Sequence, residues 1–463
     1  MLALPALANA HDHGRPLRSS SMGAYGQPLE GWLPFMGLLP GVDAYLCAAV
    51  AFARLARRGV AHTMVHYTRV QGLTPYADEA EAVARAARDV GLRIGFAVAM
   101  RDRHGLGYAD DELVLQALRP SIRDAVGQRL QTPARSPAEW LALVDEVAAR
   151  VHESGHDDHC NVQYGPAAVQ WCSTPLLEAI ARASADTGRR VHMHLLETPY
   201  QRAWADRHHP GGIVRFLDAL GLLSPRLTVA HCTHARPDEL ALLAERGVGI
   251  AVNTSSNLGL KSGIAPLAEM LRQGCRVAMG LDGMSLDEDD DALRELRLAW
   301  LIHRGRGFDV EMTAAQLWDF GAVHGRHTVM GPQDRQAGAN RSARQLVQPP
   351  VVPPGGHLTV GAPADLMQLD WDAVDDEAVL PGLDPLDLLL AHASAAHISD
   401  VVIGGRQVVS AGRVTGVDEA ALRSELLARV RSAVAARPEV DAWRRTLGEL
   451  AEDLGPFYRQ GRF

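Results

Sequence analysis

VHMHLLET, at residues 191–198, joins an apolar strand pattern to two histidines and an acidic side chain. A similar arrangement occurs in AHDH at residues 10–13, in VAH at 229–231 and in GLDG at 280–283. In each case polar residues lie at or just beyond the end of an apolar run of strand length. In a barrel of parallel strands, the carboxyl ends of the strands carry the catalytic groups. The four stretches therefore predict one site at the mouth of such a barrel.

Short apolar runs alternate with longer amphipathic stretches through most of the chain, as expected for parallel strands covered by helices. The expected strands are residues 3–10, 61–66, 92–99, 159–164, 190–195, 226–231, 248–252 and 276–281. The expected helices are residues 43–58, 77–90, 137–152, 173–187, 200–220, 236–246, 263–274 and 288–304. We therefore predict an α/β fold, a (β/α)8 TIM-type barrel.

The first ten residues, MLALPALANA, end in the small-residue pattern of a secretory cleavage site. No basic residue precedes the apolar run, however, and Pro5 interrupts it. We expect residues 3–10 to be a buried barrel strand instead.

The sequence pattern changes after the last barrel strand and its helix, and we therefore divide the chain into four parts. We expect a hydrolase barrel, an irregular insertion or linker rich in Pro, Gly, Gln and Arg, a small β-sheet satellite domain, and C-terminal helices that pack on the barrel. The corresponding ranges are 1–334, 335–356, 357–416 and 417–463, with two helices within 418–452.

Composition excludes several classes of protein. The formal net charge of -9 argues against a nucleic-acid surface, and no apolar run is long enough for a membrane span. The five cysteines are an odd number without a C-x-x-C pair, so neither a disulfide framework nor a thiolate zinc site is indicated. These features favour a reducing, cytoplasmic location.

Histidines and a carboxylate at the strand ends suit a divalent transition metal with one open position for water. His11 and His13 are two residues apart, so on a strand they share one face. His192 and His194 have the same spacing, and we assign His194 to the metal because it is nearer the mouth. A buried histidine can also be only a hydrogen-bonded core residue, the interpretation preferred for His192. Asp282 lies between Leu281 and Gly283, with Gly280 just before, and is expected to be the carboxylate ligand.

Two residues are expected to move protons. Glu197, three residues past His194, is close enough to exchange a proton with the attacking water and the leaving group. The alternative interpretation of Glu197 is a carboxylate at the start of a helix, next to Thr198 and Pro199. His231 is expected to orient the water, and His234 to be a loop or supporting residue. The acidic run 287–291 could bind a second cation, but a charge cluster at a helix start is the preferred interpretation.

These motifs resemble the amidohydrolase superfamily, and within it the mononuclear aminohydrolases similar to cytosine, guanine and adenosine-type deaminases and the triazine hydrolases. The matching stretches are 11–13, 194–198, 230–232, 253–257 with 262–266, 280–283 and 361–366. The resemblance implies that the metal ligands are His11, His13, His194 and Asp282. It also implies that Glu197, His231 and Asp282 act in catalysis.

The resemblance further implies one divalent metal ion per chain, zinc foremost and iron as the alternative. Binuclear members bridge two metals with a carboxylated lysine after the fourth strand, whereas the only lysine here, Lys261, follows the seventh. The family also has strands of a small β-sandwich before its first barrel strand. Here the barrel strand begins almost at Met1, so either the start of the gene is set too late or the satellite sheet is built from the C-terminal strands alone. An incomplete sheet would have exposed edges that favour a homodimer.

The resemblance implies hydrolytic deamination of an amino-substituted N-heterocycle of the pterin, purine, pyrimidine or triazine type, with release of ammonia. Gln163 could pair with a ring edge, and the loops after the first and third strands offer Arg15, Trp32 and Arg103 as substrate residues. Two alternatives stay open. The same fold could open a cyclic amide or displace another ring substituent, or the barrel could bind metal without catalysis.

Overall fold

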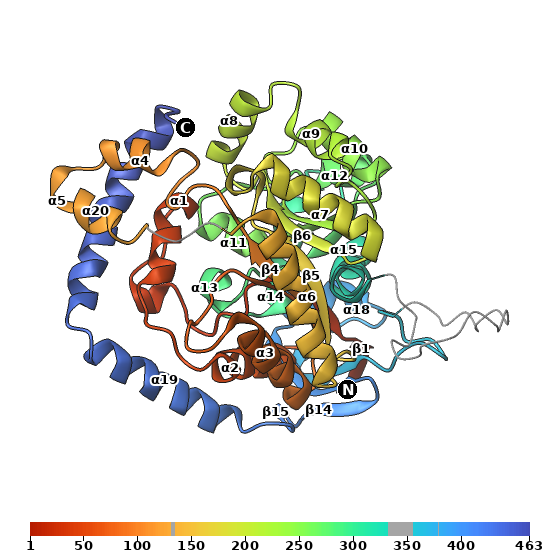
Figure 1. Ribbon diagram of the computed structural model, residues 1–463. Helices are drawn as coiled ribbons and strands as arrows, with labels where there is room; N and C mark the ends of the chain where they lie inside the picture. The colour runs from red at the N-terminus through yellow and green to blue at the C-terminus, as the bar shows by residue number, and fades with distance from the viewer. Residues whose placement is uncertain (131–134, 332–354, 378) are drawn as a thin grey trace, which may run out of the picture.

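The computed structural model describes residues 1–130, 135–331, 355–377 and 379–463. At its centre lies a sheet of eight parallel strands in the order β2-β3-β4-β5-β6-β7-β8-β9, surrounded by helices (Figure 1). The strands are β2 Leu7–Asp12, β3 Val60–Tyr67, β4 Arg93–Met100, β5 Cys160–Pro166, β6 Val191–Leu195, β7 Leu227–His231, β8 Gly249–Val252 and β9 Arg276–Met279. The predicted (β/α)8 fold is confirmed.

The first and last strands of this sheet meet through groups near the predicted site. The Asp282 amide donates to the His11 carbonyl oxygen at 2.8 Å, and the Leu281 amide donates to Asn9 Oδ1 at 2.8 Å. Residues at the two ends of the barrel sequence are thereby fixed beside each other.

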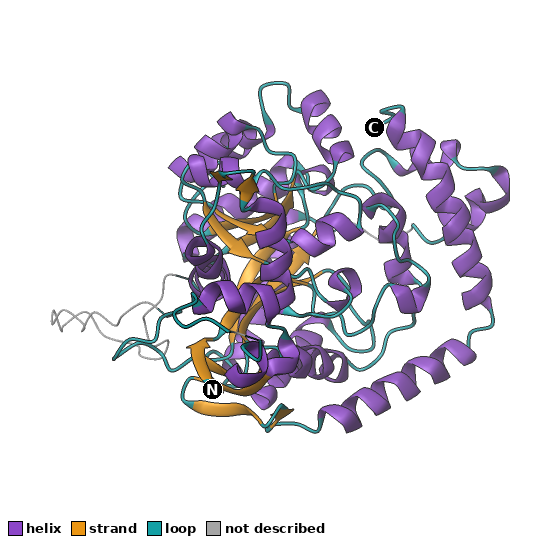
Figure 2. Cartoon of the chain, turned by 180° about the vertical axis from the view of Figure 1, so that it is seen from behind, coloured by secondary structure: helices purple, strands orange, loops and turns teal. Residues whose placement is uncertain are grey.

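Helices cover the barrel, as the secondary-structure view of Figure 2 also shows. They are α1 Leu29–Trp32, α2 Ala44–Arg57, α3 Tyr76–Val90, α4 Asp111–Ala117, α5 Pro120–Gly127, α6 Pro137–Glu153, α7 Thr174–Thr187, α8 Pro199–His208, α9 Ile213–Ala219, α10 Pro237–Glu245, α11 Thr254–Gly259, α12 Leu267–Arg272, α13 Met284–Asp287, α14 Ala292–His303, α15 Ala314–Asp319 and α16 Gly325–Met330. The single helix predicted for 200–220 is wrong. It divides into α8 and α9 because Pro210, Gly211 and Gly212 lie between them, and Gly212 has φ 101°.

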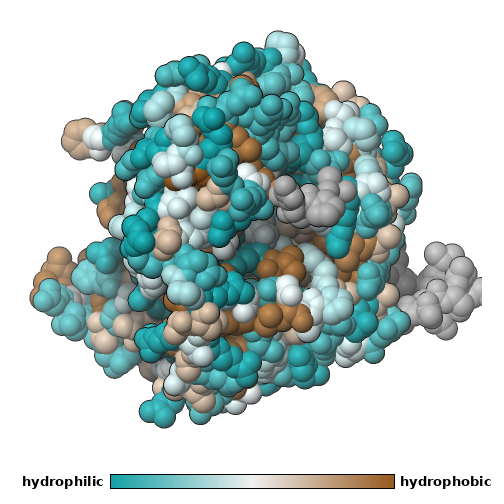
Figure 3. Space-filling model, turned by 60° about the vertical axis from the view of Figure 1, so that its left-hand side comes forward, coloured by the Kyte–Doolittle hydropathy of each residue, from teal (hydrophilic) through white to brown (hydrophobic). Residues whose placement is uncertain are grey.

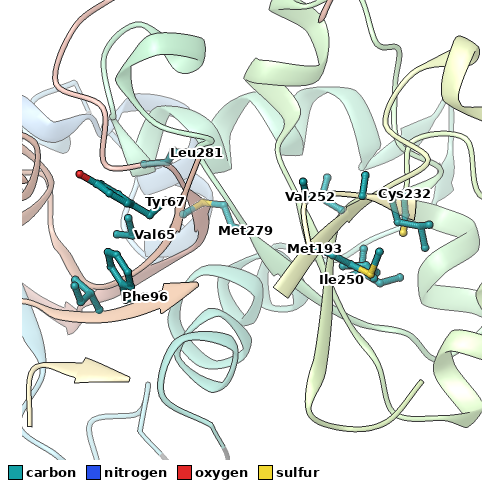
Figure 4. Packing of buried hydrophobic residues seen from close by; sticks show 14 of the residues in the cluster. Val65, Tyr67, Phe96, Met193, Cys232, Ile250, Val252, Met279 and Leu281 are labelled. Carbon is teal, nitrogen blue, oxygen red and sulfur yellow. The ribbon is translucent and has the colours of Figure 1, made fainter. Parts of the chain in front are cut away.

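The barrel strands are buried on both faces, and their apolar side chains pack on one of them. Val65, Tyr67 and Phe96 form one labelled group in Figure 4, and Met193, Ile250 and Val252 form part of another. Because successive side chains alternate, Met193 lies on the face opposite to His192 and His194. Apolar packing thus occupies one face of each strand and leaves the other for the barrel interior.

A second sheet, antiparallel and in the order β1-β12-β13-β14-β15, lies beside the barrel. Its strands are β1 Leu2–Pro5, β12 Leu366–Leu369, β13 Ile398–Ile403, β14 Arg406–Ser410 and β15 Arg413–Val414, and short helices α17 Trp371–Val374 and α18 Pro385–His392 come between β12 and β13. The prediction of one barrel strand over 3–10 is wrong, because Leu2–Pro5 pairs with Leu366–Leu369. Pro5 has no amide hydrogen to continue the ladder, and the chain enters the barrel at Leu7. The expectation of a sheet from C-terminal strands alone is likewise wrong.

Two long helices follow the second sheet, α19 Glu419–Ala435 and α20 Glu439–Arg459, and pass around one side of the barrel (Figure 1). Leu426 and Val430 of α19 pack against Leu46 and Val50 of α2. Most of the predicted linker, 335–354 of 335–356, lies outside the described residues. Among the described helices, none combines the length and apolar content needed to cross a membrane.

Asp365 connects the second sheet to the barrel. It is 4% exposed and accepts hydrogen bonds from Arg93 Nη1 at 2.9 Å, from Arg326 Nη1 at 3.1 Å and from the Gly404 amide at 2.7 Å. Burial alone would raise the pKa of this carboxyl, but His62, Arg93 and the other partners more than offset that, and the pKa lies below its usual 3.8. Asp365 is therefore a buried anion held by cations from other elements.

We predict that Asp365→Asn lowers the free energy of unfolding by about 3 kcal/mol at neutral pH, because the half-buried Arg93 and Arg326 lose their buried counter-charge. A lowered pKa in the folded state means that the stabilisation is present above the ordinary pKa and lost as the pH falls through the folded-state pKa. The difference from wild type, measured by urea unfolding, should therefore shrink below about pH 4. Asp376→Asn, at an exposed position, is the control. Equal stability of Asp365→Asn and wild type at pH 7 would contradict this account.

Candidate metal centre

Five predicted site residues meet at the carboxyl ends of four barrel strands. His11 belongs to β2 and His13 follows it, His194 belongs to β6, His231 ends β7, and Asp282 follows β9. All five side chains are buried, from 0% exposed for His11 and His231 to 9% for His194. The site thus draws its residues from both ends of the barrel sequence.

The distances are short enough for one ion. Asp282 Oδ1 lies 3.2 Å from His11 Nε2 and 3.1 Å from His13 Nε2. Ligand atoms of His11, His13 and His194 all lie within 4.8 Å of one another, and the same holds for His11, His231 and Asp282. Since several donor atoms of the right kinds converge, the arrangement can hold a divalent cation.

The ring nitrogens that face away from this point are held by hydrogen bonds. His13 Nδ1 donates to the His66 carbonyl oxygen at 2.7 Å, and His194 Nδ1 donates to the Ala167 carbonyl oxygen at 2.7 Å. His231 Nδ1 donates to Asn257 Oδ1 at 2.9 Å. Such outward bonds fix the tautomer and leave Nε2 as the lone-pair donor.

The inward-facing atoms lack partners within the described chain. His11 Nε2, His231 Nε2 and Asp282 Oδ1 are buried without a well-formed hydrogen bond, although buried polar atoms are nearly always bonded. The other carboxylate oxygen of Asp282 accepts from Ser256 Oγ at 2.6 Å. A cation between these atoms would satisfy all three, so the donor set fits a metal.

The charge states suit the same conclusion. Burial lowers the pKa of His11 to about 4, against the opposing effect of Asp282, and burial also lowers the pKa of His194 well below its usual value. For Asp282, burial would raise the pKa, but His11 and His13 hold it well below its usual range. Neutral imidazoles and an anionic carboxylate are the forms in which these groups bind metals.

The backbone is strained where the site residues leave their strands. His231 has φ 75° and Asp282 has φ 64°, left-handed values that a residue with a Cβ rarely adopts. Leu196, between His194 and Glu197, has φ 51°. Such strain persists only where the surroundings hold it, and it concentrates at functional sites.

Glu197 lies beside this cluster, with Oε2 3.7 Å from His231 Nε2. Its carboxyl is 3% exposed, and burial, with help from Asp282 and Glu30, raises its pKa well above the usual value. Its amide donates to Gln201 Oε1 at 2.8 Å, which fixes the start of α8. Glu197 is placed to exchange protons with a group bound at the cluster.

Sequence reasoning missed His66 and gave Glu30 no function. The His66 ring centroid lies 4.8 Å from that of His194, and its Nδ1 lies 3.2 Å from His192 Nδ1. Its position at the end of the predicted strand 61–66 was an available signal. Glu30 is buried and accepts from Thr198 Oγ1 at 2.6 Å and from a tyrosine hydroxyl, a contact between distant segments that no local pattern signals.

The residues given supporting functions also have defined contacts. The His192 ring stacks on His11 at a centroid distance of 4.9 Å, and His234 Nε2 donates to the Ser262 carbonyl oxygen at 2.7 Å. In the acidic run, Asp291 caps α14 by accepting from the Leu293 amide at 3.1 Å. Asp290 bonds Arg54 at 3.3 Å. No group of acidic residues at this run is arranged as a metal site among the described residues.

A cavity of about 1060 Å³ opens above the cluster. Its floor includes His13, His194, Glu197, His231 and Asp282, and its walls include the predicted substrate residues Arg15, Trp32 and Arg103. The face in Figure 3 is hollowed near its middle, where hydrophobic and hydrophilic side chains both border the hollow. The cavity can take a ligand much larger than a single heterocyclic ring.

Gln163 does not line this cavity. Its side-chain amide donates to the Val329 carbonyl oxygen and to Asn161 Oδ1, both at 3.0 Å, and the residue is fully buried. The side chain therefore lies inside the barrel, where its Oε1 is buried without a hydrogen-bond partner among the described residues, and the structure does not bring Gln163 to the cavity. Arg15, by contrast, lies over the Trp32 ring at 5.1 Å and donates to Thr68 Oγ1 at 2.6 Å.

Comparisons with known proteins agree with this fold. The sequence pattern described as "Amidohydrolase family" matches residues 2–320, more than half of the chain. A 5-methylthioadenosine/S-adenosylhomocysteine deaminase of Moorella thermoacetica is 27% identical over 439 residues, covering 93% of this chain and 87% of that protein.

Solved structures share the fold. A zinc-bound adenosine deaminase of Xanthomonas campestris is 22% identical with a TM-score of 0.68, covering 93% of this chain and 86% of that one. A mutant atrazine chlorohydrolase of Arthrobacter aurescens, complexed with zinc and atraton, is 22% identical with a TM-score of 0.71, covering 92% and 88%.

We predict that Gly280→Ala weakens metal binding roughly tenfold or more, the usual effect of disturbing residues that orient ligands. A Cβ at this position would lie 2.0 Å from Asn253 Oδ1 and 3.0 Å from His11 Cβ, so one of them must move. Metal competition with a chromophoric chelator measures the affinity. Gly211→Ala, where a Cβ meets nothing within 4 Å, is the control. Wild-type affinity in Gly280→Ala would show that the packing around His11 does not set the site.

Proposed function

Because the chain belongs to the amidohydrolase family, we propose that it is a metal-dependent hydrolytic deaminase that releases ammonia from an amino-substituted N-heterocycle. One observation carries the proposal: a buried carboxyl, Glu197, lies 3.7 Å from His231 beside a convergent set of imidazoles and one carboxylate. A binding protein needs the donor set alone. A hydrolase also needs a group that moves protons beside it.

The proposed metal ligands are His11, His13, His194 and Asp282, whose inward-facing atoms converge within the distances given above. A bound divalent ion would lower the pKa of a water molecule toward neutrality. We propose one ion per chain, zinc in preference to iron, since imidazole nitrogens with a carboxylate suit zinc. The binding of zinc by the two compared structures supports this choice.

The chain's own side chains then handle the protons of the reaction. Glu197 accepts a proton from the attacking water and passes it to a ring nitrogen of the substrate. His231, oriented by Asn257, hydrogen-bonds the water, and Asp282 holds the second proton. The water oxygen bonds to the ring carbon, the carbon–nitrogen bond to the amino group breaks, and the amine leaves as ammonia with the second proton. Atoms balance as one water consumed and one ammonia released.

The size of the cavity favours a purine nucleoside over a free base. A volume of about 1060 Å³ is at the upper end of ordinary ligand pockets. Trp32 and Trp171 supply apolar walls for a ring, and Arg15, Arg101 and Arg103 supply hydrogen-bond donors. The relative from Moorella thermoacetica is named for 5-methylthioadenosine and S-adenosylhomocysteine, both 6-aminopurine nucleosides with a 5′ substituent. We extend that substrate class to this chain.

Location and assembly are also part of the proposal. All five cysteines are free thiols, which supports the reducing compartment expected from the sequence, the cytoplasm. We retain the homodimer as a proposal. Pairing through the β15 edge of the second sheet would contribute little to such a dimer, because β15 is only two residues long and offers little backbone for hydrogen bonding.

The direct test is ammonia release by purified, metal-loaded protein from a panel of heterocycles. We predict that 5-methylthioadenosine and S-adenosylhomocysteine are deaminated, with a kcat/KM at least tenfold above those of guanine, cytosine, pterins and melamine. Coupled ammonia detection and the ultraviolet change from aminopurine to hypoxanthine give two readouts. Release of chloride or methanethiol from substituted triazines, without ammonia from any nucleoside, would contradict the proposal and favour displacement of another ring substituent.

We predict that Glu197→Gln lowers kcat at least a hundredfold while metal content stays as in wild type, because the amide fills the same space but cannot accept the proton. Steady-state kinetics and elemental analysis on the same preparation separate the two effects. Glu245→Gln, an exposed carboxylate on α10, is the matched control. Retained turnover in Glu197→Gln would remove this residue from the reaction.

A further inference from the structure

The opposite end of the barrel carries a cluster of arginines. Arg190 directly precedes β6, Arg226 directly precedes β7, and Arg276 is the first residue of β9. The amino ends of these strands lie at the end of the barrel away from the metal centre. α16 also contacts this part of the barrel and carries His327. None of these residues has a part in the proposed reaction.

The strand register brings the cluster together. Val191 pairs with Leu227, so Arg190 and Arg226 lie side by side at the start of neighbouring strands. His192 pairs with Thr228, Thr228 with Gly249, and Gly249 with Arg276, which makes one row across four strands. His192 points into the barrel, where it contacts His11 and His66, so the residues paired in its row also face inward. Arg190 is two residues before His192 and therefore lies on the same inward face.

Several polar atoms of Arg190 and of this row lack protein partners within the described chain. Arg190 is 6% exposed, and its Nε and Nη2 are buried without a hydrogen bond. Arg276 Nε and Thr228 Oγ1 are also buried and unbonded. Gly249 lets these groups approach its backbone closely, since a Cβ there would lie only 3.2 Å from Thr228 Oγ1 and 3.4 Å from Arg276 Nη2.

No carboxylate balances the charge within the described residues. Among these residues no ion pair within 4.0 Å joins Arg190, Arg226 or Arg276 to an acidic side chain. Arg226 Nε instead donates to Ser184 Oγ at 3.1 Å, and Arg276 Nη2 donates to the Gly247 carbonyl oxygen at 3.0 Å. The pKa of Arg190 is lowered to about 10, mainly by burial and further by the charges of Arg276 and Arg226. Burial, then Arg276 and Arg190, lower that of His327 to about 4. Buried like charges without a counter-charge are unfavourable.

We propose that this basal anion site, formed by Arg190, Arg226, Arg276 and Thr228, binds a tetrahedral oxyanion, namely inorganic phosphate or a phosphate monoester. Guanidinium groups donate to phosphate oxygens in pairs, and the threonine hydroxyl supplies a further donor. Half-buried Arg226 and Arg276 leave the site open to solvent from the base of the barrel. The bound anion would neutralise the arginines and fasten the amino ends of β6, β7 and β9.

The test is calorimetric titration of the metal-loaded protein with inorganic phosphate, together with thermal unfolding at constant ionic strength. We expect saturable binding of one phosphate at the basal anion site and a rise in Tm that sodium chloride does not reproduce. Arg190→Gln and Arg276→Gln should each weaken this binding at least tenfold, and Thr228→Val at least threefold. Arg182→Gln, an exposed arginine on α7, should bind as wild type does.

Phosphate could also enter the substrate cavity, so Arg103→Gln serves as a second control. Phosphate binding retained in Arg103→Gln and lost in Arg190→Gln supports the basal anion site, and the reverse pattern overturns it. A Tm rise that sodium chloride reproduces overturns it too. If Arg190→Gln does not fold, the conservative Thr228→Val variant decides, and wild-type affinity there contradicts the proposal. Glycerol phosphate binding as tightly as inorganic phosphate assigns the site to phosphate esters, and binding of inorganic phosphate alone assigns it to the free ion.

Discussion

The structure depends on one electrostatic constraint: a buried carboxylate, Asp282, faces the ring nitrogens of His11 and His13 at 3.2 and 3.1 Å. An uncompensated ion in such a place costs several kcal/mol. The lone pairs of neutral imidazoles and the carboxylate oxygen point at the same space, so a divalent cation placed between them would satisfy all of these atoms at once. The barrel, the strand-end strain and the outward hydrogen bonds all serve to keep these atoms convergent.

The positions of the site residues are therefore fixed by hydrogen bonds and backbone conformation around them. The Asp282 amide is tied to the His11 carbonyl oxygen, which closes the barrel at the point where the two donors meet. His194 and His231 are oriented by the Ala167 carbonyl oxygen and by the Asn257 side chain. Left-handed backbone at His231 and Asp282 turns the chain sharply as it leaves the strands. Rigid placement of this kind lowers the cost of organising a reaction, because little has to move when substrate binds.

The sequence predicted the parts of this structure that follow from local periodicity. Strand and helix periods predicted the eight-stranded barrel, and the i, i+2 spacing predicted that His11 and His13 share a face. His194, His231 and Asp282 were predicted from their positions at strand ends and from the family resemblance. Long-range pairing lay beyond it: nothing local shows that Leu2–Pro5 joins strands from the other end of the chain. The position of Gln163 away from the cavity has a related cause, because its carbonyl partner at Val329 comes from a distant helix. The contacts of Glu30 and the cluster of arginines at the base likewise form only when segments distant in the sequence come together in the fold.

The two ends of the barrel thus carry opposite electrostatic requirements, a cation at the mouth and, as we propose, an anion at the base. The central claim concerns the mouth, and anomalous diffraction from crystals of the metal-loaded protein, collected on both sides of the zinc absorption edge, tests it most directly. The account predicts a single anomalous peak in each chain, about 2.0–2.2 Å from His11, His13, His194 and Asp282. A peak elsewhere, or metal-loaded crystals with no peak among these side chains, would contradict it.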